Sequence, residues 1–233
     1  MSGKSAIVTG SSSGIGRAIA ERLLADGWQV HGLDVAPASI RADAFTAHGI
    51  DLTQADATRA LISRLVAAGS PGAFIHCAGI TRLGPLGTLK DEDGLLLWQL
   101  HVDACTRLAN SVIPAMQAAR RGRVVLIGSR SSTGMAGRSQ YAACKAALVA
   151  LARSWAAEVV TDGVTVNVVS PAATLTPMLQ DPARATTSPR MPPIGRFIEP
   201  REVAGLVAYL LSDDAAAITG QDIAICGGAT LRQ

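Results

Sequence analysis

The chain has few cysteines, and they lie far apart. The four cysteines among its 233 residues occupy positions 77, 105, 144 and 226, so none has the spacing of a zinc knuckle or a C-x-x-C redox pair. A chain of this length with so little cysteine also differs from small secreted domains that disulfides hold together. We therefore expect free thiols, no metal site and a cytoplasmic protein.

Long apolar runs and an excess of one charge are also missing. No apolar stretch reaches 18 residues, and the first residues run into a strand pattern without a signal-like segment. The formal net charge is +3, from 21 basic and 18 acidic residues that are scattered along the chain. This balance gives no electrostatic reason to expect a nucleic acid or a membrane as a partner.

What the sequence does contain is an alternation of short apolar runs with helical patterns. This order indicates parallel strands joined by right-handed crossovers, and the length suits one domain. The fold class predicted is α/β, a doubly wound (Rossmann) parallel sheet of about seven strands with helices on both faces, in a single domain over residues 1–233. Strands are expected at 6–9, 28–34, 47–50, 73–76, 122–128, 164–169 and 222–225, and helices at 18–24, 57–68, 89–119, 141–160 and 202–211.

A glycine-rich turn follows the first strand pattern and precedes a helical one. Gly10, Gly14 and Gly16 are spaced G-x-x-x-G-x-G, which differs from the usual G-x-G-x-x-G of dinucleotide sites. Glycines still permit close approach of the backbone, and the amides at a helix N-terminus bind phosphate. Ser12 and Ser13 add hydroxyl donors. An ordinary Gly/Ser turn is the alternative.

A carboxylate ends the second strand pattern. Asp34 follows Gly16 at close to the spacing of ~20 residues expected for the acid that binds the adenosine ribose hydroxyls. It would repel a 2′-phosphate, and the glycine turn holds no Arg or Lys to offset it. This favours NAD over NADP as the cofactor, although an Asp after a strand is also common turn chemistry.

Tyr141 and Lys145 stand four residues apart in an alanine-rich helical pattern. The spacing puts both side chains on one helix face, and a cation within about 4–6 Å favours the ionised form of a phenol. Such a phenol is a usable general acid or base near neutral pH. Ser129 follows a buried strand pattern and is placed to reach the same point. The alternative is a solvated helix face, which is what most pairs with this spacing form.

The alternation stops between residues 172 and 200, a stretch with little periodicity and six prolines. It follows the carboxyl end of a strand, where open α/β sheets bind ligands. We interpret it as a lid-like substrate loop, with disorder as the alternative.

Taken in order, these motifs resemble the short-chain dehydrogenase/reductase family over essentially the whole chain. Within this family, the sequence is similar to 3-oxoacyl-(acyl-carrier-protein) reductases and to NAD-dependent alcohol dehydrogenases. The matching segments are residues 9–16, 34, 51–53, 78–79, 128–129, 141–145, 167–171 and 220–228.

The resemblance implies roles for individual residues. Tyr141 exchanges a proton with the substrate oxygen, Ser129 hydrogen-bonds that oxygen, and Lys145 binds the nicotinamide ribose. It also implies a homo-oligomer, a tetramer or a dimer. The NAD-binding residues that it implies are Gly10, Ser12, Ser13, Gly14, Ile15, Asp34, Asp51, Leu52, Cys77, Ala78, Gly79, Tyr141, Lys145, Pro171, Thr174 and Thr176.

Three positions depart from the family pattern. His101 stands where the family commonly has an asparagine that helps to seat a water in a proton relay. The imidazole can hold a water or titrate itself, and His101 is therefore a fourth catalytic candidate; the alternative is a spacer whose backbone does the work. Cys77 replaces another asparagine, which predicts altered bonding between sheet and helix, and Ala172 replaces a glycine.

The function predicted is NAD-dependent hydride transfer between nicotinamide and a secondary alcohol or ketone. The alternatives are a reductase of 3-oxoacyl thioesters, which Asp34 disfavours because biosynthetic reductions usually use NADPH, and a dinucleotide sensor without turnover. Arg82, Arg130 and Arg138 fall in loops near the expected reaction centre. They suggest an anionic substrate, unless they pair with acids at a subunit contact.

Overall fold

A seven-stranded sheet runs through the protein, and every pair of neighbouring strands in it is parallel. The computed structural model describes residues 4–180 and 189–231. The strand order is β3-β2-β1-β4-β5-β6-β7, which confirms the doubly wound α/β prediction. The strands are β1 (Ser5–Thr9), β2 (Gln29–Asp34), β3 (Phe45–Gly49), β4 (Ala73–His76), β5 (Gly122–Ile127), β6 (Val164–Pro171) and β7 (Asp222–Ile225).

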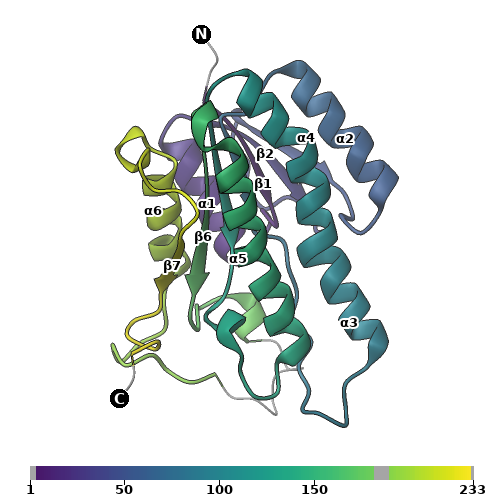
Figure 1. The fold of residues 1–233 in the computed structure, drawn as a ribbon, viewed down its shortest axis with the longest axis vertical. Coiled ribbons are helices and arrows are strands. Elements are labelled where there is room, and N and C mark those ends of the chain that lie inside the picture. The colour runs from purple at the N-terminus through teal and green to yellow at the C-terminus, as the bar shows by residue number, and fades with distance from the viewer. Residues whose placement is uncertain (1–3, 181–188, 232–233) are drawn as a thin grey trace.

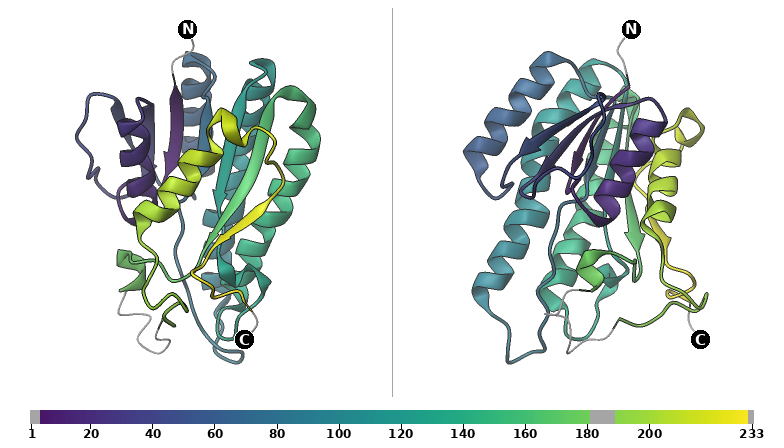
Figure 2. Two further views of the ribbon diagram at one scale, coloured as in Figure 1. Left: turned by 90° about the vertical axis from the view of Figure 1, so that its left-hand side faces the viewer. Right: turned by 180° about the vertical axis from the view of Figure 1, so that it is seen from behind.

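Helices cover both faces of the sheet (Figures 1 and 2). Helices α1 and α6 lie on one face, and α2, α4 and α5 lie on the other. Within the described residues, no helix combines the length and the apolar character needed to cross a membrane. The helices are α1 (Gly14–Ala25), α2 (Ala55–Ala68), α3 (Asp91–Trp98), α4 (Ala104–Ala118), α5 (Ser139–Val159) and α6 (Pro200–Leu210).

The strands contribute side chains to two separate apolar cores, one on each face of the sheet. Successive side chains of a strand point to opposite faces, so on β4 Phe74 joins the core under α2, α4 and α5 while Ile75 joins the core under α1 and α6. Strands β5 and β6 are buried along their whole length. Burial on both faces fits the apolar run at residues 124–127 of β5, whereas β6 also buries the polar residues Thr165, Asn167 and Ser170.

The strand order reverses between β1 and β4. The chain moves outward from β1 to β2 and β3, then crosses to the other side of β1 to form β4. At such a point the loops after the two central strands diverge and leave a crevice at their carboxyl ends. The glycine turn after β1 and the segment 77–80 after β4 border this crevice.

The long helix expected over residues 89–119 is interrupted. Helix α3 ends at Trp98, a π-helical turn occupies Gln99–Asp103, and α4 begins at Ala104. A π turn takes one extra residue and is common at functional sites. Here it turns His101 and Val102 into the protein, where both are buried.

The segment that follows β6 is tied together at its base. Thr174 and Ile198 form an isolated parallel bridge, in which the Leu175 amide donates to the Ile198 carbonyl at 2.8 Å and the Ile198 amide donates to the Ala173 carbonyl at 3.0 Å. A 3₁₀ turn over Pro177–Leu179 follows. Part of the expected lid, residues 181–188, lies outside the described residues, so its role as a lid stays a prediction.

Candidate active site

A cavity of about 540 Å³ opens at the carboxyl ends of the strands, where the strand order reverses. All but one of the site residues expected from the sequence lie on its wall. Ser12 is the exception, because its amide faces Asp34. The expected residues that line the cavity are Gly10, Ser13, Gly14, Ile15, Asp34, Asp51, Leu52, Cys77, Ala78, Gly79, His101, Ser129, Tyr141, Lys145, Pro171, Thr174 and Thr176.

At one end of the cavity, a carboxylate is held by backbone amides. The two oxygens of Asp34 accept hydrogen bonds from the Ser12 amide and the Ala36 amide, each at 2.9 Å. Asp34 thus joins the glycine turn to the end of β2 and presents negative charge at the wall. Asp51 also lines the cavity. Hydrogen bonds from the hydroxyl and the amide of Thr53 hold the pKa of its carboxyl below the usual range.

The glycine turn packs directly on the segment after β4. Gly10 has φ +70°, and a Cβ built there would lie 2.9 Å from the backbone of Ala78. A side chain would therefore force the two loops apart and widen the crevice. The glycine turn leads directly into the N-terminus of α1, and its role in binding a pyrophosphate there stays a prediction.

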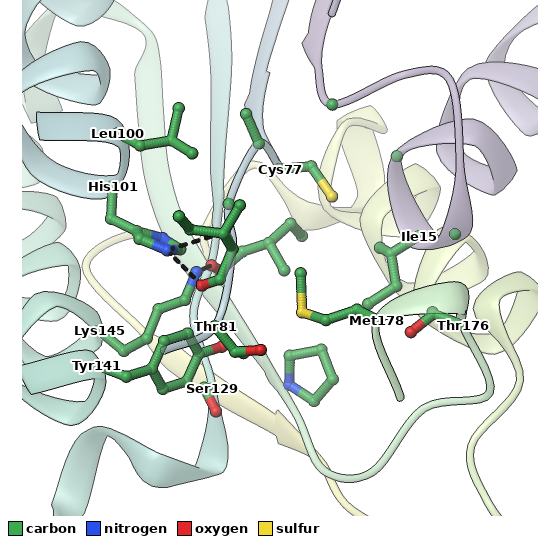
Figure 3. Close-up of a pocket in the computed structure, with 18 of the residues that line it drawn as sticks. Ile15, Cys77, Thr81, Leu100, His101, Ser129, Tyr141, Lys145, Thr176 and Met178 are labelled. Atoms are coloured by element: carbon green, nitrogen blue, oxygen red, sulfur yellow. Dashed lines mark hydrogen bonds between the residues drawn. The ribbon is translucent and has the colours of Figure 1, made fainter. Parts of the chain in front are cut away.

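At the other end, Tyr141 and Lys145 lie together on α5, as the spacing predicts. Their side chains are only 9% and 4% exposed. The Lys145 Nζ donates to the Ile127 carbonyl at 2.7 Å and lies 5.7 Å from the centroid of the Tyr141 ring. Figure 3 shows His101, Lys145 and Tyr141 on one side of the cavity, opposite Thr176.

Ser129 sits at the start of a 3₁₀ turn that follows β5. Its Oγ accepts the Ser131 amide at 3.1 Å. This bond orients the hydroxyl and leaves its hydrogen available for an oxygen in the cavity. Ser129 and Tyr141 both line the cavity and are labelled in Figure 3.

The His101 side chain takes part in the site directly. Its Nε2 lies 3.0 Å from the carbonyl oxygen and 3.2 Å from the amide nitrogen of Ile80, and its ring meets Tyr141 edge-on at 5.6 Å (Figure 3). A side chain at Gly79 would collide with this imidazole. Burial, with the charge of Lys145, holds the pKa of His101 well below its usual range, so the ring is neutral. The imidazole thereby ties the π turn to the segment after β4.

A second histidine was missed by the sequence analysis. The hydroxyl of Thr9 accepts the amides of Cys77 and Ala78, each at 3.0 Å, and lies 3.1 Å from the Nδ1 of His76. With two donors on its oxygen, Thr9 gives its own hydrogen to His76, which leaves the imidazole hydrogen on Nε2. Burial, followed by the charge of Lys145, lowers the pKa of His76 to about 3. The sequence signal that could have found it is the position of His76 at the end of the apolar run 73–75.

Cys77 enters this network through its backbone and not through its thiol. Burial raises the pKa of the thiol to about 12, so it stays protonated. The Thr9 hydroxyl accepts the amides of Cys77 and Ala78, and the predicted change in bonding between sheet and helix stays a prediction. Among the described residues, His76 Nε2 and His101 Nδ1 are both buried without a hydrogen-bond partner, although the carbonyls of Leu100 and His101 act on His76 electrostatically.

The fold and the cavity together define a dinucleotide-binding oxidoreductase of the α/β class. A family model described as enoyl-(acyl carrier protein) reductase matches residues 10–230. The chain is 38% identical to the 3-oxoacyl-(acyl-carrier-protein) reductase FabG of Escherichia coli, with 97% of both chains covered. It is 31% identical to the FabG of Thermotoga maritima, with 98% of both covered. The chain belongs to the short-chain dehydrogenase/reductase family.

Solved structures agree with this assignment. The ligand-free aldohexose dehydrogenase AldT of Thermoplasma acidophilum superposes with a TM-score of 0.90 at 28% identity, covering 99% of this chain and 95% of that one. ElxO with NADP bound also gives a TM-score of 0.90, covering 99% and 100%, but at 21% identity it supports the fold alone. The protein is thus an oxidoreductase that uses a nicotinamide dinucleotide.

Proposed function

We propose that this protein transfers hydride between NAD(H) and a secondary alcohol or ketone, with Tyr141 as general acid and base. The observation that carries the proposal is the meeting of Tyr141, Lys145 and Ser129 on one wall of the cavity. Lys145 is fixed by the Ile127 carbonyl, so its charge stays near the phenol. Ser129 has its hydroxyl hydrogen free for a substrate oxygen.

The residues present fit a dinucleotide across the cavity. The bare backbone at Gly10 and the N-terminus of α1 suit the pyrophosphate, Asp34 suits the adenosine ribose, and Lys145 suits the nicotinamide ribose. Asp51, Leu52, Ala78 and the threonines of the β6 loop would complete the site. When bound, the nicotinamide supplies hydride in reduction and accepts it in oxidation.

The protein's own residues handle the proton. In reduction, Ser129 donates a hydrogen bond to the carbonyl oxygen and Tyr141 gives that oxygen its phenolic proton. In oxidation, the Tyr141 phenolate takes the proton from the hydroxyl. The buried ammonium of Lys145 lies near the phenol and would stabilise the negative charge that develops on its oxygen while the proton moves. His101 packs its ring edge on Tyr141 and would fix the position of the phenol.

The preference for NAD over NADP is part of the proposal and rests on Asp34. Both of its oxygens are held by amides, so the carboxylate cannot easily turn away from a 2′-phosphate. Repulsion at this wall would select the unphosphorylated ribose.

A second candidate function is reduction of a 3-oxoacyl thioester. It is favoured by the reductase names of the relatives at 31–38% identity over almost the whole chain. Asp34 weighs against it, to the extent that such biosynthetic reductions draw on NADPH.

One panel experiment tests the proposal. Simple ketones, secondary alcohols and acetoacetyl thioesters are supplied with NADH, NADPH or their oxidised forms, and the absorbance of the reduced nicotinamide is followed. Turnover of ketones with NADH supports the first candidate, and thioester reduction with NADPH supports the second. If the protein binds the cofactor but turns over none of the substrates in the panel, both candidate functions are wrong and a dinucleotide sensor is favoured.

We also propose a homo-oligomer, dimeric or tetrameric, on the strength of family membership. Light scattering of the purified chain at micromolar concentration tests this directly, and a monomer would contradict it.

A further inference from the structure

The catalytic end of the cavity is lined by cations, whereas the acids lie at the other end. Among the described lining residues, the acids are Asp34 and Asp51, which follow β2 and β3. Ser129 follows β5, three strand spacings from β2, which is about 14 Å. The cations that line the cavity are Arg82, Arg130, Arg138, Lys145 and Arg190.

Arg82 does not explain this charge. It forms an ion pair with Asp93 at 3.2 Å, so its charge is met within the chain. Lys145 is committed to the Ile127 carbonyl and to the Tyr141 phenol.

Arg130 is different, because its described partner is neutral. It is half-buried, and its guanidinium donates to the Ala229 carbonyl at a long 3.5 Å. No acid of the described residues lies within ion-pair distance of it. A charge that is partly withdrawn from water and has no counterion favours an anion in the space that it faces.

The backbone of Arg130 is fixed next to Ser129. It is the residue after Ser129 and opens the 3₁₀ turn Arg130–Thr133, which the bond from the Ser131 amide to the Ser129 hydroxyl holds in place. A guanidinium offers a planar fork of donors that matches a carboxylate or a phosphate. A molecule whose oxygen lies on Ser129 and Tyr141 would thus have an oxyanion receptor one residue away along the chain.

We propose that the substrate carries an oxyanion, a carboxylate or a phosphate, which Arg130 binds while the carbonyl or carbinol faces Tyr141. This inference rests on the proposed function and narrows it to anionic ketones and alcohols. The bound anion supplies the counterion that Arg130 lacks among residues 4–180 and 189–231. Neutral substrates of the same shape leave the guanidinium unpaired and bind more weakly.

Matched substrate pairs test the proposal. Acetoacetate is compared with its methyl ester, and dihydroxyacetone phosphate with dihydroxyacetone, so the two arms separate carboxylate from phosphate. We expect one anionic member to exceed its neutral partner in kcat/KM by about 10- to 100-fold. Arg130→Met should abolish that preference mainly by raising KM for the anionic member. Arg153→Met, on the exposed face of α5, is the matched control and should keep the preference.

A binding measurement makes the result independent of turnover. The Tyr141→Phe variant, loaded with NADH, is titrated with acetoacetate and with dihydroxyacetone phosphate in a calorimeter. One of them should bind, and the added Arg130→Met substitution should weaken that binding at least tenfold. Equal kcat/KM for charged and neutral partners, or binding that survives Arg130→Met, would overturn the anion site and leave the proposed function standing. Absence of turnover on every ketone, with NADH bound, would instead defeat the proposed function.

Discussion

The two ends of the cavity differ in the chemical groups that form them. The nucleotide end consists of bare backbone at the glycine turn and a carboxylate, Asp34, held by two amides. The catalytic end consists of side chains from three segments that meet only in the fold, among them Ser129, His101 and Lys145. Backbone sites bind what many family members bind, whereas side-chain sites can diverge. The particular chemistry of this protein is therefore concentrated at the catalytic end.

The largest effect should come from removing the cation at the catalytic end. Lys145→Met leaves the Ile127 carbonyl without its donor and the phenol without a neighbouring charge. We expect kcat to fall about 10²- to 10³-fold, measured by NADH oxidation with the best ketone of the panel. Lys90→Met, at an exposed lysine, is the control. Comparable loss in both variants would remove the special role of Lys145.

The nucleotide end should control which cofactor is used. Asp34→Asn removes the charge and one of the two hydrogen bonds from the backbone amides, because its NH2 group cannot accept. The ratio of kcat/KM for NADH over NADPH should therefore fall about 30- to 100-fold. Asp43→Asn, at an exposed aspartate, should leave the ratio as it is. Kinetics with both cofactors check this. An unchanged ratio in Asp34→Asn would mean that this carboxylate stabilises the loop but does not discriminate between NADH and NADPH.

The two buried histidines should make stability depend on pH. Their pKa values are lowered in the fold, that of His76 to about 3, so the unfolded chain binds more protons below pH 6.5. Stability is then complete above pH 6.5 and falls as the pH drops towards 5, by up to ~1.4 kcal/mol per pH unit for each histidine. Urea unfolding at several pH values measures this slope. His76→Asn should reduce it, and an identical slope would contradict the assignment.

The smallest effect is expected for His101→Asn. One imidazole nitrogen faces both the amide and the carbonyl of Ile80 and can serve one of them at a time. An asparagine amide can accept from the first and donate to the second together, so kcat should stay within about threefold and stability should hold. His101→Leu leaves both groups unpaired and should cost about 1–3 kcal/mol. Equal thermal stability of the two variants would show that the Ile80 contacts are unimportant.

Much of the fold and the nucleotide end could be predicted because their signals are local. Apolar runs marked the strands, and the glycine turn and Asp34 lie within one strand–turn–helix–strand unit. Tyr141 and Lys145 were predicted from a single helical turn. The Thr9–His76 network and the π turn at His101 were not, since each depends on contacts between residues 20 to 70 positions apart. The partner of Arg82 also became visible only in the fold.

The most direct test of the account is the rate of hydride transfer in Tyr141→Phe, with NADH binding measured on the same sample. Phenylalanine keeps the ring that packs on His101 but has no proton to give. We expect NADH still to bind while single-turnover reduction of the ketone slows at least 100-fold. Reduction at the wild-type rate, with NADH bound, would contradict it.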